Sequence, residues 1–290
     1  MLSRRKAIHR SPPTRIHSRP LFGQLSLDLR PKERLARRRR RRRVIAAFVV
    51  CVLMGVSVWG VGIISYNEHF AIDDVSVAGT KVLSPRVLKA AFDTKLYDGA
   101  YHLFSRTNVF LFPASDIVRA LENDYLRIST LSISRPSLLS QAVRVTITER
   151  EPKYSWCDTT CYLMDANGFI FATLDKAATT TGYVFKGGLV ENRLPVGQTF
   201  LRGRLNGITE LFRGLEAVGF TPKGATIEND MDVRVDLAEG FYLKVSFGSD
   251  PHVIAKNLEL ITGSDALKGK LYTLSYVDLR FGDKVYYQMK

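Results

Sequence analysis

A run of seven arginines followed directly by an uncharged apolar stretch constrains this chain more than any other feature. The arginines occupy positions 37–43, and residues 44–65 contain no charged side chain. At a rise of about 1.5 Å per residue, a helix of this length can cross a hydrocarbon core of roughly 30 Å. We therefore expect a transmembrane helix over residues 44–66. Trp59 and Tyr66 stand towards its far end, where interfacial aromatic side chains are favoured.

The charges that flank this stretch predict its orientation. Seven arginines stand on one side and Glu68 on the other, and positively charged flanks tend to stay in the cytoplasm. A cleaved signal peptide is the alternative, but a 43-residue leader and an apolar run longer than roughly 15 residues argue against it. We expect a single-pass protein of the cell (inner) membrane, with a cytoplasmic N-terminus and an extracytoplasmic C-terminal portion.

The basic charge of the chain is confined to its N-terminal tail. The first 43 residues hold 16 of the 42 Lys and Arg residues and two of the 28 acidic ones, which accounts for the whole net charge of +14. The remainder is neutral and offers no general phosphate-neutralising surface, so nucleic acid is not an expected partner. The tail over residues 1–43, with four prolines, is expected to be disordered and to lie against anionic lipid headgroups. Contact of the tail with DNA is the alternative.

Residues 69–151 predict a small domain of mixed secondary structure. A strand pattern opens the block, a helix begins at Ser84, and a second helix follows Pro113. Two strands close the block, and in the second one apolar and polar residues alternate over residues 143–148. The order strand, helix, helix, strand, strand matches the polypeptide-transport-associated module, POTRA.

Residues 152–290 predict a mostly antiparallel β domain with flanking helices. Turn sequences at 165–168 and 239–240 join alternating strands, and helical patterns lie near 205–218 and 252–261. The fold class expected for the chain is therefore α+β, with one transmembrane helix followed by two domains.

The sequence has no recognisable catalytic constellation. The histidines lack metal-ligand spacing, and no Gly-x-Ser-x-Gly elbow occurs. We expect no enzyme activity, metal, cofactor or small-molecule substrate. Cys157 and Cys161 bracket a short turn, and outside the cytoplasm a local disulfide is favoured over two free thiols. Their spacing differs from the Cys-x-x-Cys of redox catalysts.

The final hairpin is the expected binding surface. A terminal strand often lies at a sheet edge, where unpaired N–H and C=O groups can accept a strand from another chain. Its first strand, over residues 274–281, is expected to pack one face and to leave the other polar. The packed set is Val277, Leu279 and Phe281, and the polar set is Tyr276, Asp278 and Arg280. Phe281 serves either as a partner anchor or as a core residue.

Five short motifs are spread between the apolar stretch and the end of the chain. They are Val75 to Gly79, Arg135-Pro136, Glu149-Arg150-Glu151-Pro152 before Trp156, Leu163-Met164-Asp165 with Gly168 to Phe171, and Val277-Asp278-Leu279-Arg280-Phe281. In order and spacing they resemble the bacterial cell-division family FtsQ/DivIB, which has a short cytoplasmic tail, one span, a POTRA domain and a C-terminal β domain. The cysteine pair is a departure from the family pattern.

The resemblance implies a non-catalytic scaffold of the cell-division machinery, located at the division septum. Such a scaffold would bind FtsB-like and FtsL-like single-span proteins, contact other divisome proteins and link them to septal peptidoglycan synthesis. Partner binding in the family centres on the terminal hairpin, which makes Phe281, Asp283, Val285, Tyr286 and Tyr287 the expected binding residues. The alternative function is a POTRA-containing component of a protein export or assembly system.

Overall fold

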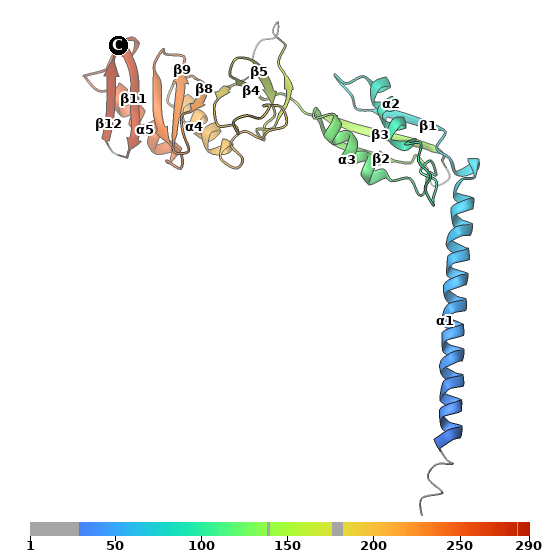
Figure 1. The fold of residues 1–290 in the computed structure, drawn as a ribbon. Coiled ribbons are helices and arrows are strands. Elements are labelled where there is room, and N and C mark those ends of the chain that lie inside the picture. Colours follow the sequence, from blue (N-terminus) through green and yellow to red (C-terminus); the bar gives the residue numbers. More distant parts are fainter. Residues whose placement is uncertain (1–28, 138–139, 176–181, 283) are drawn as a thin grey trace, which may run out of the picture. The chain divides into compact units, whose positions relative to one another are not determined.

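The computed structural model describes residues 29–137, 140–175, 182–282 and 284–290. This part of the chain is mixed α and β, with five α-helices and two sheets, of three and nine strands (Figure 1). The chain divides after Ser65 into two compact units, the second running from Tyr66 to Lys290.

The first unit contains the helix α1 (Leu29–Ser65). Its portion Arg37–Ser65 is long and apolar enough to cross a membrane, by length and composition, and no other helix in the described residues meets that test. The apolar side chains of this portion are largely exposed along its length, as a helix surrounded by lipid requires.

The helix starts earlier than the sequence predicted. The expectation of a disordered tail is wrong for residues 29–43, which are helical, whereas residues 1–28 lie outside the described residues. Arginine is a good helix former, and a helix already formed by the apolar stretch extends at little cost per added residue. Pro31 is tolerated because it lies in the first turn, where backbone N–H groups have no intrahelical acceptor.

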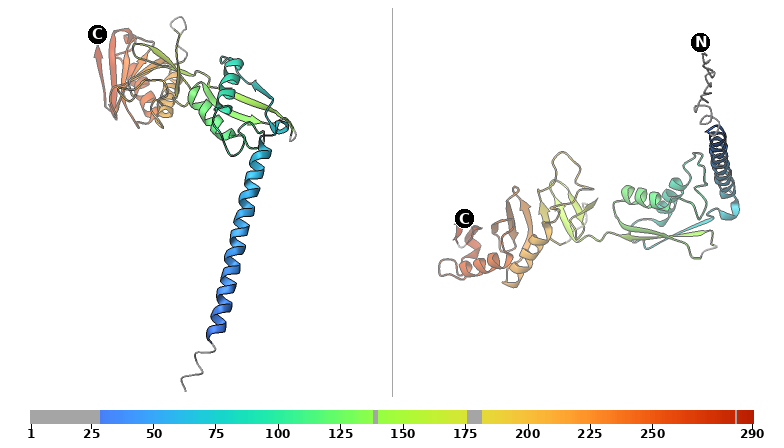
Figure 2. Two further views of the ribbon diagram at one scale, coloured as in Figure 1. Left: turned by 45° about the vertical axis from the view of Figure 1, so that its right-hand side comes forward. Right: turned by 90° about the horizontal axis from the view of Figure 1, so that it is seen from below.

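The second unit begins with a module that we call the first module (residues 66–151). Its elements are η1 (Glu68–Phe70), β1 (Asp74–Ala78), α2 (Pro85–Leu96), α3 (Ala114–Asp124), β2 (Ile128–Ser134) and β3 (Ala142–Glu149). The sheet order is β1-β3-β2, with β3 parallel to β1 and antiparallel to β2. Figure 2 shows both helices on one side of this sheet.

The core of the first module follows from the alternation in β3. Val143, Val145 and Ile147 are at most 2% exposed, and the residues between them face solvent. Gly79 ends β1 with φ near +86°, and a Cβ there would stand only 2.2 Å from the carbonyl oxygen of Ile147. Only glycine therefore allows the chain to leave β1 so close to β3.

The second module (residues 152–290) holds the nine-stranded sheet. Its elements are β4 (Tyr154–Cys157), β5 (Cys161–Met164), β6 (Ile170–Thr173), β7 (Val184–Lys186), α4 (Leu205–Ala217), β8 (Pro222–Ile227), β9 (Asp232–Leu237), β10 (Tyr242–Ser246), α5 (Pro251–Thr262), η2 (Leu271–Thr273), β11 (Leu274–Phe281) and β12 (Lys284–Met289). The strand order is β12-β11-β10-β9-β8-β7-β4-β5-β6. Neighbours are antiparallel except in the pairs β10–β11, β7–β8 and β4–β7.

The core of the second module lies between this sheet and the helices α4 and α5, which pack against each other. Phe185, Phe200 and Phe212 are fully buried there, and the ring of Phe185 contacts the rings of the other two. Close packing of the parallel pair β7–β8 requires Gly224, because a Cβ at that position would lie 1.8 Å from the carbonyl oxygen of Val184. The two modules thus have separate cores.

Candidate partner-binding edge

The last strand, β12, forms one edge of the nine-stranded sheet. It pairs antiparallel with β11 on its inner side, with Val277 opposite Tyr287 and Asp278 opposite Tyr286. Within the described residues no strand pairs with its outer side, which we call the terminal edge. Figure 1 shows β12 as the outermost strand beside the C-terminus. Every second residue of such a strand directs its backbone N–H and C=O outward, where they can accept another chain.

Several contacts hold the terminal hairpin, β11 and β12, in place. The side-chain amide of Asn257 in α5 donates a hydrogen bond of 3.0 Å to the carbonyl oxygen of Gly282 in the turn. At the other end, the backbone N–H of Lys290 donates to the carbonyl oxygen of Thr273 at 2.7 Å. Because both ends are fixed, the terminal edge is a preorganised surface that a partner can bind with a small cost in ordering.

Three aromatic side chains of the hairpin are exposed. Phe281 is 54% exposed, Tyr286 53% and Tyr287 42%. The rings of Phe281 and Tyr286 meet edge to face with centroids 5.4 Å apart. Val285, in contrast, is half-buried and packs against the core of the second module, so it supports the strand. Asp283 lies outside the described residues.

The expected faces of β11 need two corrections. Phe281 was expected on the packed face with Val277 and Leu279, but it is exposed, because the register shifts between Asp278 and Phe281 and breaks the alternation. Asp278 was expected on a wet face, yet it is only 5% exposed. Neighbouring side chains cover it, and a salt bridge with Arg280 satisfies its charge.

The charged groups around Asp278 form a short network. Arg280 donates hydrogen bonds to Asp278 at 2.9 and 2.7 Å and to Asp232 at 3.0 Å. Burial by itself raises the pKa of Asp278, but the hydrogen bonds and the positive charge of Arg280 outweigh it and leave the pKa below its ordinary value. The hydrogen bond to Asp278 raises the pKa of Arg280 in turn.

This network continues across the polar face of the sheet as alternating cations and aromatic rings. The guanidinium of Arg234 lies 4.2 Å from the ring centroid of Tyr242, and the ammonium of Lys244 lies 4.5 Å from that of Tyr276. Sequence reasoning missed this face, although charges at every second position in Asp232-Val-Arg-Val-Asp236 were a signal for it. The polar face is therefore internally paired, and the free aromatic surface of the hairpin is at Phe281 and its neighbours.

The cysteine pair lies at a distance in sequence from this edge. Cys157 and Cys161 stand opposite each other across the β4–β5 hairpin and form a disulfide. The remaining cysteine, Cys51, is a free and exposed residue of α1. The disulfide closes a tight turn, and so it stabilises the hairpin without exposing a reactive thiol.

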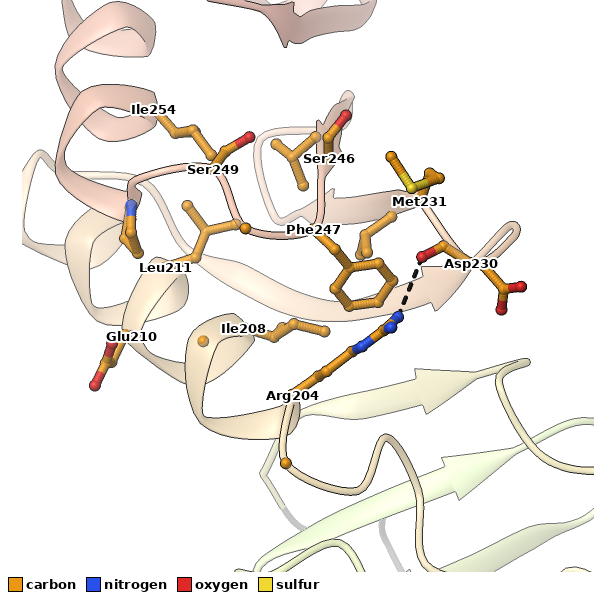
Figure 3. A pocket seen from close by; sticks show the side chains of 16 residues that line it. Arg204, Ile208, Glu210, Leu211, Asp230, Met231, Ser246, Phe247, Ser249 and Ile254 are labelled. Atoms are coloured by element: carbon orange, nitrogen blue, oxygen red, sulfur yellow. Dashed lines mark hydrogen bonds between the residues drawn. The ribbon is translucent and has the colours of Figure 1, made fainter.

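A cavity of about 510 Å³ opens between α4, the β8–β9 turn and the segment that leads into α5. Figure 3 shows Arg204 extended beside Phe247, with a hydrogen bond of 3.2 Å to the carbonyl oxygen of Asp230. Ile208 and Leu211 supply apolar walls. None of the lining residues belongs to β11 or β12, so this cavity is separate from the terminal edge.

In the part of the chain that the structure describes, no group of three or more His, Cys, Asp or Glu side chains is arranged to hold a metal ion. The sequence matches no protein-family model. It also shows no significant similarity to a curated protein. The class that the fold defines is a mixed α/β chain with one helix long and apolar enough to cross a membrane.

Proposed function

We propose that this protein is a non-catalytic, membrane-anchored scaffold of the bacterial cell-division machinery, of the FtsQ/DivIB type. The order β1, α2, α3, β2, β3 supports a POTRA assignment for the first module. The motifs that carry the family resemblance fall at structural landmarks, such as Gly79 at the end of β1 and Asp165 in the turn before β6. The helix α1 supplies the membrane anchor, with the N-terminus in the cytoplasm.

The observation that carries the proposal is the open outer side of β12. A partner segment in extended conformation adds to this side as a further strand, since the backbone groups of β12 supply hydrogen bonds at a regular spacing. The six residues of β12 offer about three outward-facing pairs of N–H and C=O groups. Backbone pairing fixes the register of the partner, and side chains beside the strand select which partner binds.

Selectivity is assigned to the exposed aromatic side chains. Phe281 and Tyr286 form one continuous aromatic surface, and Tyr287 stands on the opposite face of β12, because successive residues of a strand alternate. An incoming strand would lie between these two surfaces. Aromatic anchors of this kind dominate interface energies. The partners proposed are FtsB-like and FtsL-like single-span proteins, through which the scaffold acts on septal peptidoglycan synthesis together with other divisome proteins.

A photo-cross-linking experiment tests the proposal. A cross-linkable amino acid replaces Tyr287 at the edge or, as a matched control, Tyr272, an exposed aromatic residue of η2 outside β12. After illumination of intact cells, the Tyr287 variant is expected to form an adduct with a small single-span protein, identified by mass spectrometry, and the Tyr272 variant is not. Equal adducts from both positions, or none from Tyr287, would count against the terminal edge as the binding site.

The alternative, a component of an export or assembly system, uses the same edge chemistry on passing polypeptides. The two functions differ in where the protein gathers. A fluorescent fusion of the full chain is expected to concentrate at midcell before the cell divides. A uniform distribution around the cell membrane throughout the cell cycle would favour the export function.

A further inference from the structure

The first module exposes a group of large apolar side chains at the point where the chain leaves α1. Each of them is at least 38% exposed, and they come from two segments, residues 66–70 and 97–111. The group, which we call the juxtamembrane patch, consists of Tyr66, Phe70, Tyr97, Tyr101, Leu103, Phe104, Phe110 and Leu111. None of these residues contributes to the core of the first module, so the module does not need them for its own packing.

Hydrogen bonds join the two segments of the patch. The N–H of Ile72 donates to the carbonyl oxygen of Thr107, and the N–H of Val109 donates to that of Phe70, both at 2.8 Å. The hydroxyl of Tyr66 donates to the carbonyl oxygen of His102 at 2.6 Å. These bonds tie the loop between α2 and α3 to the residues that directly follow α1.

Ring contacts run across the same junction. The rings of Tyr66 and Tyr101 stack with centroids 6.2 Å apart, and those of Phe70 and Phe110 meet edge to face at 6.1 Å. The patch is therefore one surface built from both segments. An exposed apolar surface of this kind marks an interaction site.

The loop that carries most of the patch has its own internal supports. Asp98 accepts hydrogen bonds from the backbone N–H of Ala100 at 3.1 Å and from the ring of His102 at 2.9 Å. These two bonds lower the pKa of Asp98 below its ordinary value. Arg106 donates to the carbonyl oxygen of Lys95 at the end of α2. The loop is thus held with its apolar side chains outward.

The position of the patch in the chain places it next to the membrane surface, which indicates the lipid bilayer as its binding partner. Tyr66 directly follows Ser65, the last residue of the helix that is able to cross a membrane. Adjacent Cα atoms are about 3.8 Å apart, so a patch that begins at Tyr66 is tethered at the surface of the bilayer that α1 enters. Tyrosine, phenylalanine and leucine are among the side chains that favour the boundary between headgroups and acyl chains.

The near-neutral charge of the patch also favours the lipid bilayer over a charged protein partner. The two segments of the patch contain two acidic residues, Glu68 and Asp98, and one permanent cation, Arg106. A second cation, Arg135, lies with its guanidinium 4.7 Å from the ring centroid of Phe110, so the opposite charges balance. A surface with so little net charge offers no electrostatic preference for an acidic or a basic protein partner. It matches the lipid interface, where burial of apolar and aromatic side chains supplies the binding energy.

We propose that the juxtamembrane patch inserts into the headgroup–acyl boundary and docks the first module on the bilayer. The module then has two attachments, the helix α1 and the patch, which together limit its tumbling. This inference rests on the membrane anchoring within the proposed function and is independent of what binds the terminal edge.

The test places a polarity-sensitive, thiol-reactive dye on the full chain in phosphatidylcholine vesicles, with and without lipids that carry a nitroxide quencher at the headgroup. Cys51→Ala removes the free thiol, and Leu103→Cys adds one in the patch. Val82→Cys is the matched control, because Val82 is an exposed apolar residue of the same module. Val82 follows β1, whereas Tyr66 and Phe70 of the patch precede it, so Val82 and this part of the patch are separated by about 16 Å along that strand.

The dye at Leu103 is expected to emit further to the blue than the dye at Val82 and to lose more of its fluorescence to the nitroxide lipids. Tyr101→Ser with Phe104→Ser, added to the Leu103→Cys chain, separates docking from mere tethering. These changes should lower the docked population about tenfold or more, because each removes a large side chain from the interface.

Two results would overturn the inference. Equal, water-like signals from the dyes at Leu103 and Val82, in chains that float with the vesicles, would reject docking and leave the anchor intact. Chains that fail to float with the vesicles would reject the membrane anchor itself, and the patch would lose its proposed occupant. Cross-linking at Tyr287 would be unchanged in the first case.

Discussion

The substitution Phe281→Ala separates partner binding from folding. Phe281 is more than half exposed and contacts the ring of Tyr286 and the guanidinium of Arg280, which lies 5.5 Å from the ring centroid. Exposed contacts of these two kinds are each worth about 0.5–1 kcal/mol. The loss in the free energy of unfolding should therefore stay at about 1–2 kcal/mol. A fully buried core phenylalanine would cost about 3–5 kcal/mol instead.

The effect on binding should be larger than the effect on folding. An aromatic anchor that becomes buried in an interface contributes about 2 kcal/mol or more, which corresponds to a roughly 30-fold loss of affinity. The assay measures the affinity of the detergent-solubilised chain for the single-span protein that cross-links at Tyr287. Thermal unfolding of the same samples reports stability. Tyr272→Ala is the control, since it removes another exposed aromatic side chain outside β12.

Two outcomes would refute this reasoning. If Phe281→Ala lowers the melting temperature as much as a core substitution such as Phe212→Ala does, then Phe281 belongs to the packed interior in solution. If affinity and stability both stay at the values of Tyr272→Ala, then Phe281 is not an anchor, and selectivity must come from other residues beside the terminal edge.

Three further predictions concern stability. Glu149→Gln should cost about 1–3 kcal/mol, because the carboxylate of this 7%-exposed residue accepts three backbone N–H bonds at 2.7–3.0 Å. Burial raises the pKa of Glu149, but these bonds outweigh it and hold the pKa below normal. The stabilisation is therefore complete above the unfolded pKa of about 4.3 and is lost as pH falls through the lower folded pKa. Urea titrations across that pH range should show a weaker acid dependence in the variant, and an unchanged dependence would contradict the assignment. Replacing Cys157 and Cys161 with Ser should cost about 2 kcal/mol at most, because the closed loop is short; calorimetry that finds a much larger loss would show that the bond does more than close this turn. Gly79→Ala should destabilise the first module by more than about 1 kcal/mol, because alanine disfavours the positive φ and its Cβ would meet the carbonyl oxygen of Ile147, and unchanged denaturant unfolding would contradict the close approach to β3.

Much of the fold was predictable from the sequence, because the order of apolar and polar residues within a single strand or helix determines which of its faces is buried. Successive side chains of β3 point to opposite faces of the sheet, so its buried face can be predicted from the alternation of apolar and polar residues in the sequence. The positions of α4 and α5 follow in the same way from helical periodicity. The parallel pairing of β10 with β11 across the intervening α5 depends on contacts between distant segments. Alternation within one strand carries no information about such a neighbour.

The candidate site was predictable as a region and less so in its side chains. The edge position of β12 followed from its place at the end of the last hairpin, and the aromatic residues there were visible in the sequence. The exposure of Phe281 was not, because a register shift after Asp278 reverses the expected face. The burial of Asp278 depends on its pairing with Arg280 and on neighbouring strands, which no alternation rule includes.

The most direct test of the central claim is amide hydrogen exchange along β12, measured on the solubilised chain alone and with its captured partner. If the partner adds a strand at the terminal edge, alternate amides of residues 284–289 should gain protection, since their outward N–H groups acquire acceptors. Unchanged exchange throughout β12 in a complex of full affinity would contradict strand addition and would place the binding site elsewhere on the chain.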